Sequence, residues 1–232
     1  MTVLRRDTRQ LRLSSFAAAP LNYLPYMGDV EASYADRAEE YVRVVGSMEV
    51  VHPSDKQLVT DWARSIGGPV LDVGCGPGQW TDHLLTHDVD VRGIDPTRAL
   101  VELARTTYPN CRFDDGRAED LDAQSGSVAG ILAWYSLIHH DPSDIRFAFE
   151  EFARVLRPGG KLLIGFFEAP TLEPFDHAVI TAYRWPVGAL RAQLDAAGFT
   201  TVETHTRTGL EYRPHGAILA ELTNADDNLR QQ

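Results

Sequence analysis

Basic residues, cysteine and long apolar runs are all scarce in this chain. Lysine and arginine total 22 against 33 aspartate and glutamate residues, which gives a formal net charge of -11. Proteins that bind nucleic acid usually present clustered Lys and Arg to the phosphates, so this balance argues against nucleic acid as a partner. No apolar run approaches the roughly 20 residues that cross a bilayer, and the first residues lack the apolar segment of a secretory leader. We therefore expect a cytoplasmic protein with no membrane partner.

The two cysteines, Cys75 and Cys111, stand far apart in the sequence. Neither belongs to a C-x-x-C pair, so a zinc knuckle is not expected and we predict no bound metal. Two cysteines are also too few for the disulfide framework of a small secreted domain, which favours free thiols in a reducing compartment. A length of 232 residues suits a single domain, residues 1–232, with a substantial core. The oligomeric state, monomer or homodimer, is left open.

From residue 69 onward, apolar runs typical of strands alternate with amphipathic segments of about 10–15 residues. The predicted strands are 69–74, 90–95, 110–115, 128–136, 161–167, 201–206 and 216–222. The predicted helices are 78–87, 96–108, 142–160 and 187–199, with Pro96 in the first turn of the second and a Pro-Gly-Gly turn ending the third. The alternation predicts an α/β fold with a mostly parallel sheet of seven strands. The last two strands, close in sequence, predict an antiparallel hairpin at its edge.

Two helices are predicted before the first strand. Residues 31–50 place Tyr34 and Tyr41 at helical spacing, and residues 53–67 form a second amphipathic segment. The residues before these helices have weak periodicity. We therefore interpret residues 1–50 as an N-terminal extension that includes a helical lid.

The most informative stretch is VLDVGCGPGQW, residues 70–80. Three glycines, Gly74, Gly76 and Gly78, directly follow an apolar run and precede a helix. Glycines let the main chain approach a ligand without Cβ interference, and a strand–loop–helix junction brings backbone N–H groups to one point. Ligands of open α/β sheets bind beyond the carboxyl ends of the strands, so we predict a ligand site at this loop. A purely structural turn is the alternative.

Two aspartates border the loop and restrict the ligand. Dinucleotide sites have the pattern G-x-G-x-x-G around a pyrophosphate, whereas the sixth position here is Gln79. Asp72 stands where it would face a phosphate, which is unfavourable for a dianion and favourable for a cation. Asp95 follows the next strand, where a carboxylate accepts hydrogen bonds from ribose hydroxyls or caps the following helix. The implied ligand is a nucleoside with a cationic, non-phosphate arm.

Five segments then form a recognisable set. They are VLDVGCGPG at 70–78, GIDP at 93–96, AED at 118–120, ILAWYSLIHH at 131–140 and LRPGGKLLI at 156–164. In this order and spacing they resemble the class I S-adenosylmethionine-dependent methyltransferases over roughly residues 65–170, which would form the cofactor-binding core. The resemblance implies a Rossmann-like, doubly wound sheet with an antiparallel C-terminal strand, S-adenosylmethionine as the cofactor, and methyl transfer as the activity.

The resemblance also implies where the cofactor lies. Its methionine arm would lie against Asp72 and the glycine loop, its ribose against Asp95, its adenine beside residues 116–119, and its methyl donor under residues 134–136. The implied cofactor-binding residues are Asp72, Gly74, Cys75, Gly76, Gly78, Asp95, Pro96, Arg117, Ala118, Glu119, Trp134, Tyr135, Ser136 and, from the lid, Tyr41. For Tyr41, simple helix packing is the alternative. Arg117 departs from the many relatives that have an aspartate near the adenine amino group.

Two further groups concern the acceptor. His139 and His140 follow the fourth predicted strand, and either is a candidate general base; the alternative is a pair of loop histidines satisfied by water and backbone. Adjacent side chains do not easily converge on one metal, so metal ligation is set aside. Residues 171–186 are aromatic and longer than a plain connector. We interpret them as a substrate-side insert in which His177 and Arg184 contact the acceptor.

The predicted function is methyl transfer from S-adenosylmethionine to a nucleophile on a small molecule. Enzymes that methylate exocyclic amino groups of nucleic acid usually carry a polar-Pro-Pro-aromatic motif after the fourth strand, and this chain has WYSLIHH there. One alternative is a protein that binds S-adenosylmethionine without catalysis. Another is an NAD(P)-dependent oxidoreductase, against which Gln79 in place of a glycine counts.

Overall fold

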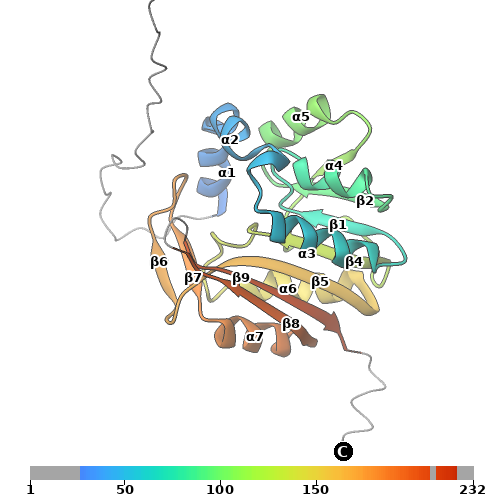
Figure 1. The fold of residues 1–232 in the computed structure, drawn as a ribbon, viewed down its shortest axis with the longest axis vertical. Helices are drawn as coiled ribbons and strands as arrows, with labels where there is room; N and C mark the ends of the chain where they lie inside the picture. The colour runs from blue at the N-terminus through green and yellow to red at the C-terminus, as the bar shows by residue number, and fades with distance from the viewer. Residues whose placement is uncertain (1–26, 210–212, 224–232) are drawn as a thin grey trace, which may run out of the picture.

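A computed structural model describes residues 27–209 and 213–223 (Figure 1). The helices are α1 (Met27–Asp36), α2 (Ala38–Val45), the short 3-10 helix η1 (Met48–Val50), α3 (Pro53–Arg64), α4 (Gln79–Leu85), α5 (Arg98–Thr107), α6 (Ile145–Val155) and α7 (Val187–Ala196). The strands are β1 (Val70–Val73), β2 (Val91–Asp95), β3 (Arg112–Asp115), β4 (Val128–Trp134), β5 (Leu156–Glu168), β6 (Glu173–Phe175), β7 (Ala182–Trp185), β8 (Phe199–Arg207) and β9 (His215–Leu222). Most of the extension predicted before residue 31 lies outside the described residues.

The strands form one sheet in which β3, β2, β1, β4 and β5 are neighbours in that order and run parallel. β9 pairs antiparallel with β5, and β8 pairs antiparallel with β9, so the last strand lies inside the sheet and β8 at its edge. The predicted Rossmann-like α/β fold, mostly parallel with an antiparallel C-terminal strand, is confirmed. The strand order reverses between β1 and β4, and ligands of such sheets bind beyond the carboxyl ends at this point.

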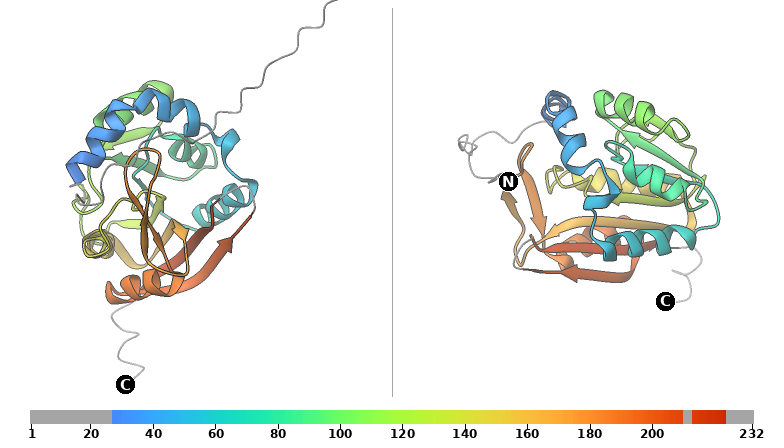
Figure 2. Two further views of the ribbon diagram at one scale, coloured as in Figure 1. Left: turned by 90° about the vertical axis from the view of Figure 1, so that its left-hand side faces the viewer. Right: turned by 45° about the horizontal axis from the view of Figure 1, so that its top comes forward.

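The predicted count of seven strands is too low, because the insert at 171–186 contributes β6 and β7. β5 continues past the last residue of β4. Without a further partner, the main chain of β5 would present an unpaired edge beyond this point. β7 fills this place by pairing with Phe167 and Glu168, and β6 pairs with β7 as a hairpin. Figure 2 (left) shows this hairpin rising toward α1 and α2. The insert therefore extends the sheet beyond the carboxyl end of β4.

Helices cover both faces of the sheet, and the alternation of side chains along each strand decides which helix a residue meets. Val70 of β1 packs in a cluster with Val59 of α3, whereas its neighbour Leu71 packs in a cluster with Phe149 of α6. α3 and α4 thus lie on one face, and α6 and α7 on the other (Figure 1). The buried stripe of α6 has helical spacing and consists of Ile145, Ala148, Phe149, Phe152 and Val155. With both faces covered, the carboxyl edge is the side of the sheet that is open to a ligand.

Three predicted boundaries are wrong in detail. The single helix predicted over 31–50 is divided into α1, α2 and η1, because Arg37 leaves the helical conformation with φ of -118° and ψ of 15°. Pro96 precedes α5, because the Asp95 carboxylate accepts the Thr97 N–H and Thr97 becomes the residue that precedes the first turn. The Pro-Gly-Gly segment predicted to end a helix is instead the start of β5, with a register shift against β4.

Three further observations concern the described part of the chain. No helix there is both long enough and apolar enough to cross a membrane. Nor does that part contain a cluster of three or more His, Cys, Asp or Glu side chains arranged to hold a metal ion. Cys75 and Cys111 are both free thiols, as the sequence predicted.

Candidate active site

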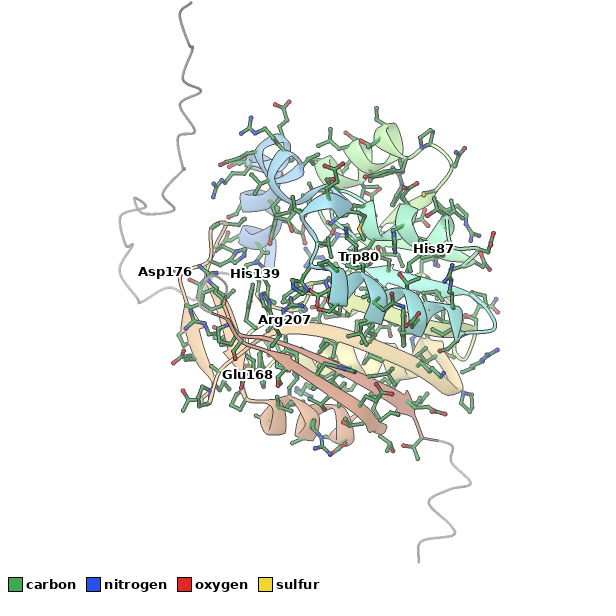
Figure 3. All side chains as sticks on the ribbon, in the orientation of Figure 1. Trp80, His87, His139, Glu168, Asp176 and Arg207 are labelled. Carbon is green, nitrogen blue, oxygen red and sulfur yellow. The ribbon has the colours of Figure 1, made fainter. Side chains whose placement is uncertain are left out.

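A cavity of about 740 Å³ opens at the carboxyl edge of the parallel strands. This volume lies within the range of about 300–1,000 Å³ that is typical of small-molecule sites. Residues that follow or end β1 to β5 line it, and residues of α1, α2 and the insert cover it. Figure 3 shows Trp80, His139 and Arg207, which come from distant parts of the chain, near one another in the middle of the view.

The cavity has two chemically different parts. The acidic half is lined by residues 72–76, 95–97 and 117–119, which end or follow β1, β2 and β3. The ring half is lined by side chains that lie on the β4 and β5 side of the sheet: Trp134, Tyr135, His139, Phe167, His177 and His215. Because β1 and β4 are neighbours, the two halves meet where the strand order reverses.

The glycine loop of the acidic half is fixed by backbone contacts. Gly74 and Gly76 have φ of 73° and 54°, a region that residues with a Cβ rarely adopt. A Cβ on Gly74 would lie 2.2 Å from the Cβ of Ser136, so the loop and the segment after β4 approach closely only because this residue is glycine. The N–H groups of Gly74 and Cys75 both donate to the Ile94 carbonyl, at 2.7 and 3.0 Å. The loop is thereby tied to the end of β2.

The Asp95 carboxylate connects this loop to the next one. It accepts a hydrogen bond from the Gly76 N–H and another from the Thr97 N–H, each at 2.8 Å. Only 6% of the residue is exposed, and burial raises the pKa of Asp95 against the opposing effect of these two bonds. A carboxylate has about four acceptor positions, so Asp95 keeps acceptor capacity for a ligand in the cavity that it lines.

Asp72 is the second buried carboxylate of the acidic half. Its Oδ2 accepts a hydrogen bond of 2.7 Å from Thr81 Oγ1, and 2% of the residue is exposed. Burial raises the pKa of Asp72 to about 7, although the Thr81 hydrogen bond opposes the shift. The two cations among the described lining residues, Arg117 and Arg207, are paired with other carboxylates. A cationic ligand would therefore stabilise the ionised form of Asp72, and an anionic one would be repelled.

Cys75 and Gly78 have structural roles in the loop. Cys75 lines the cavity, but it packs in a cluster with Phe113, and burial raises its thiol pKa well above the usual value. Such a thiol is protonated and unreactive at neutral pH. Gly78 does not line the cavity; a Cβ there would lie 2.6 Å from the Phe113 ring. The third glycine is thus explained by close packing of α4 against β3.

Residues 117–119 complete the acidic half. Arg117 forms an ion pair with Glu31 of α1, and Ala118 lines the cavity beside it. Glu119 accepts a hydrogen bond of 2.6 Å from Nε2 of His140. Burial is the largest single influence and would raise the Glu119 pKa, but this hydrogen bond, a backbone hydrogen bond and the charges of His140 and Arg117 together lower it. The loop after β3 is therefore anchored at one end to the lid and at the other to the segment after β4.

Tyr135 has an unusual backbone conformation, with φ of 57°. Positive φ is rare for a bulky residue and costs on the order of 1–3 kcal/mol, which makes it a marker of functional sites. Here it turns the chain directly after β4 and places the ring 5.1 Å from that of Phe167, centroid to centroid. The Tyr135 hydroxyl lies 2.6 Å from Nδ1 of His215, and burial raises its pKa.

His139 is held in one tautomer. Its Nδ1 lies 2.8 Å from the Thr181 carbonyl, which can only accept, so Nδ1 carries the proton. Nε2 therefore has the lone pair, and it accepts a hydrogen bond of 2.9 Å from the Tyr34 hydroxyl of α1. Burial lowers the pKa of His139 to about 4, so the ring is neutral at physiological pH. Its lone pair is available to any group that replaces the Tyr34 hydroxyl.

His140 is arranged differently. Its Nε2 is the donor to Glu119, and its Nδ1 is buried with no hydrogen-bond partner among the described residues. Only 3% of the residue is exposed. Of the two adjacent histidines, His139 therefore presents its basic nitrogen toward the lid, whereas His140 is enclosed by its surroundings.

Polar contacts hold the lid and the insert over the cavity. Besides the bonds of Glu31 and Tyr34, Arg37, the residue between α1 and α2, donates to the Ala178 carbonyl of the insert. The Tyr34 and Tyr41 rings meet edge to face, 5.1 Å apart, and burial raises the pKa of Tyr41 to about 12. α1 thus touches the loops after β3 and β4, and the residue that follows it touches the insert, so this segment spans both halves of the cavity.

Of the two insert residues predicted to contact the acceptor, one lines the cavity. His177 is a lining residue, and its Nδ1 accepts the Val179 N–H at 3.4 Å, so the neutral ring carries its proton on Nε2. Burial lowers the pKa of His177 to about 3. Arg184 does not line the cavity. It pairs with Glu173 at 2.9 Å and lies over the ring of Phe175, 4.5 Å from its centroid.

Comparison with known proteins decides the family. Residues 70–160 match the model of a methyltransferase domain family. An uncharacterized methyltransferase of Synechocystis sp. is 30% identical over 156 residues, which are 63% of this chain and 74% of that protein. The chain belongs to the class I S-adenosylmethionine-dependent methyltransferases.

Other similar proteins match this methyltransferase over part of their length. The O-methyltransferase rstn1 of Aspergillus nomiae is 35% identical over 151 residues, which cover 59% of this chain and 66% of that protein. For an uncharacterized methyltransferase of Mycobacterium tuberculosis the values are 33% over 134 residues, 56% of this chain and 53% of that protein. The chain therefore spans about half to two thirds of the length of these two relatives.

A solved structure is similar over nearly the whole chain. It is the 1,6-didemethyltoxoflavin-N1-methyltransferase of Burkholderia thailandensis, with a TM-score of 0.73 over 90% of this methyltransferase and 94% of that protein. The two sequences are 21% identical, so the likeness establishes a common fold. The insert and the lid belong to the part of the chain that lies outside the residues matched by the family model.

Most residues that the sequence singled out lie around the cavity of this methyltransferase, and the exceptions are Gly78 and Arg184. Sequence reasoning missed Phe167 and His215, which line the ring half, and Glu31 of the lid. It also missed Arg207, which binds the Asp55 carboxylate through both guanidinium nitrogens at 2.7 and 2.8 Å. These residues lie in ordinary strand or helix segments, and no local pattern marks them. The alternation along β5 and β9 was the available signal, since it places Phe167 and His215 side by side.

Proposed function

We propose that this chain transfers a methyl group from S-adenosylmethionine to a nucleophile on a small molecule. The observation that carries the proposal is the acidic half: two buried carboxylates on a backbone-built loop, with both described cations of the lining already paired. Such a place favours a positively charged nucleoside over a pyrophosphate. The O-methyltransferase name of a relative and the S-adenosylhomocysteine bound in a similar structure support it.

The residues present fit the cofactor. Asp95 has acceptor positions left for the two hydroxyls of a ribose, and Asp72 offers a negative charge for the methionine arm. Gly74 and Gly76 leave room along the main chain because neither carries a Cβ. Arg117 and Ala118 would lie beside the adenine, and Tyr41 would cover the cofactor from the lid. When bound, S-adenosylmethionine supplies a methyl group on a sulfonium, an activated leaving group that needs no further catalyst.

The protein's own contribution is to align the acceptor and to remove its proton. Positioning of two reactants contributes as much as about 7–11 kcal/mol in ideal intramolecular models. For an acceptor hydroxyl, bound S-adenosylmethionine would supply the methyl carbon to the oxygen, and its sulfur would keep the electron pair of the broken S–C bond. The hydroxyl proton passes to Nε2 of His139.

His139 is the better candidate for the base. The Thr181 carbonyl fixes the proton on Nδ1, so the lone pair is on Nε2, which faces the lid. The Tyr34 hydroxyl donates a hydrogen bond to this nitrogen. An entering hydroxyl replaces one O–H donor by another at the same nitrogen. His140 also lines the cavity, but its Nε2 donates to Glu119 and its Nδ1 is buried with no hydrogen-bond partner among the described residues. His140 is therefore assigned to hold Glu119 and the loop after β3 in place.

Further parts of the proposal concern the setting of the reaction. The net charge of -11 and the paired cations of the cavity favour a small-molecule acceptor over nucleic acid. Two free thiols fit a reducing compartment such as the cytoplasm. Whether the chain acts as a monomer or a homodimer stays a prediction.

Titration of the purified protein tests the cofactor assignment. Calorimetry with S-adenosylmethionine, S-adenosylhomocysteine and NADH should show binding of the first two and none of the third. A radiolabelled-methyl assay over a panel of small acceptors then tests turnover. Binding of NADH would favour an NAD(P)-dependent oxidoreductase. Binding of S-adenosylmethionine with no methyl transfer to hydroxyl, amine, thiol or carbon acceptors would indicate a protein that binds the cofactor without catalysis.

A further inference from the structure

The ring half forms a continuous aromatic wall. Consecutive ring centroids lie 5.4 Å apart for Trp134 and Tyr135, 5.1 Å for Tyr135 and Phe167, 6.1 Å for Phe167 and His177, and 5.2 Å for His177 and His139. The His215 ring adds to the wall at 5.8 Å from Phe167. These separations are those of mutually packed rings, and all six residues line the cavity.

The wall is electrically neutral at physiological pH. Burial lowers the pKa of His139, His177 and His215, so these rings do not carry charge there. Two cations lie near the wall. Arg207 is bound by both oxygens of Asp55, and Arg213 lies over the Phe167 ring, 5.9 Å from its centroid, without lining the cavity. Within the described lining, the wall therefore offers ring surface and single N–H or O–H groups, but no unpaired charge for a phosphate or a carboxylate.

The wall ends at the proposed base. His139 is itself the last ring of the wall, and its Nε2 is the nitrogen to which the Tyr34 hydroxyl donates. A flat molecule against Phe167 and His177 would thus have an edge substituent within reach of that nitrogen. The Tyr34 hydroxyl that lies at this nitrogen is itself an aromatic hydroxyl, so an aromatic hydroxyl of an entering molecule can take the same position.

We infer that the acceptor is an uncharged, planar aromatic or heteroaromatic hydroxy compound that packs on the ring half with its hydroxyl at Nε2 of His139. This inference rests on the proposed function and specifies its substrate class. The strained backbone of Tyr135 fits the same purpose, because it is what places the Tyr135 ring against Phe167. A saturated molecule of equal size would fill the space but would not gain the interaction between ring faces and edges.

Two probes of the same carbon skeleton test the inference. The full-chain protein is first saturated with S-adenosylhomocysteine, and 2-naphthol and decahydro-2-naphthol are then titrated by calorimetry. We expect 2-naphthol to bind at least about tenfold more tightly and to be the better methyl acceptor with S-adenosylmethionine. Equal binding of 2-naphthol and decahydro-2-naphthol would overturn the inference. As a charged control, 2-naphthyl phosphate is titrated in the same way. If it binds more tightly than 2-naphthol, the inference is also overturned, because the cavity would then have a site for an anionic group.

Matched ring deletions locate the binding. Phe167→Leu removes a ring that lines the cavity, whereas Phe175→Leu removes its packing neighbour, 5.3 Å away, which does not. We expect Phe167→Leu to weaken 2-naphthol binding about tenfold with S-adenosylhomocysteine affinity unchanged, and Phe175→Leu to change it less than about twofold. Equal losses in both variants would contradict a stacking role for Phe167.

The order of the titrations separates two failures. If S-adenosylhomocysteine does not bind the parent protein, the proposed function fails. If it binds and 2-naphthol shows no preference over its saturated counterpart, only the substrate class fails. Circular dichroism of each variant, together with its S-adenosylhomocysteine affinity, shows whether the leucine substitutions preserve the fold.

Discussion

The acidic half and the ring half of the cavity are built in different ways. The acidic half is mostly main chain: loop glycines, backbone N–H groups and two carboxylates that come from β1 and β2, which are adjacent strands. The ring half is side chain only, and its residues range from Trp134 to His215. A site made of main chain is fixed by the fold, whereas a site made of side chains can change with few substitutions. The difference suits a constant cofactor and a variable acceptor.

The two halves also differ in electrostatics. Burial raises the pKa of Asp72 and Asp95, so the acidic half holds two carboxyl groups whose ionised forms a cation would stabilise. In the ring half, burial lowers the pKa of His139 and His177, so the side chains are neutral. The same physical cause, the loss of water, thus prepares one half for a charged ligand and the other for an uncharged one.

The largest expected effect separates chemistry from cofactor binding. His139→Gln should lower the rate of methyl transfer about 100–1,000-fold, the contribution of a positioned general base, with no change in S-adenosylhomocysteine affinity. His205→Gln on the outer face of β8, where the side chain is half exposed, is the matched control and should leave both unchanged. Single-turnover rates and calorimetry measure the two quantities. If His140→Gln instead shows the large loss of rate, the base assignment is wrong.

The next effect tests whether the acidic half depends on close main-chain packing. Gly74→Ala would force a Cβ to within 2.2 Å of Ser136 in a residue with φ of 73°. We expect the free energy of unfolding to fall by about 2–3 kcal/mol. Gly188→Ala in α7, where a Cβ meets nothing within 4 Å, should instead raise it by about 0.5–1 kcal/mol. Urea unfolding of both variants provides the comparison, and equal stabilities would refute the close-packing argument.

A third test concerns the carboxylate that connects the two loops. Asp95→Ala removes two backbone hydrogen bonds and the acceptors proposed for the ribose. Cofactor binding should weaken by about 1–3 kcal/mol, or roughly 5–150-fold. Asp114→Ala on neighbouring β3 removes an exposed ion pair with Arg92 and should cost less than about twofold. Unchanged affinity in Asp95→Ala would contradict the ribose assignment.

The smallest effect is a pH dependence that only the acidic half should show. The pKa of Asp72 is raised to about 7 from the usual 3.8, so its carboxyl is mostly protonated at pH 6 and mostly ionised at pH 8. Affinity for the cationic cofactor should therefore fall about tenfold from pH 8 to pH 6, because protonation removes the attraction. Calorimetry at both pH values measures it, and Asp72→Asn should flatten the dependence.

The same group affects the stability of the free protein in the opposite direction. The folded state binds the Asp72 proton more tightly than the unfolded state, so this group stabilises the fold below about pH 4 and the contribution is lost as pH rises through about 7. Thermal unfolding of the free protein should show this loss, and Asp72→Asn should reduce it. A stability that rises with pH through this window, in the parent but not in Asp72→Asn, would contradict the raised pKa.

Sequence reasoning was most successful where main-chain geometry is the signal. The strand–glycine–helix junction predicted the loop at Gly74 and Gly76, and the position after the next strand predicted Asp95 at its rim. It failed for the strand count, because no local sequence pattern shows that β5 extends beyond the end of β4 and pairs there with another strand, β7. It placed His139 and His140 after β4 but did not predict which of them is the base. The two differ in their hydrogen-bond partners, which are Thr181 and Tyr34 for His139 and Glu119 for His140.

The sequence by itself determined the α/β alternation, the glycine loop and the two carboxylates, because each depends on contacts between residues near in the chain or on adjacent strands. Tertiary structure alone decided which rings meet in one wall and how His139 is oriented. Those features depend on side chains that are brought together from α1, β4, β5, the insert and β9. Hydrophobic periodicity reports that such side chains are buried, but not which other side chains they will meet.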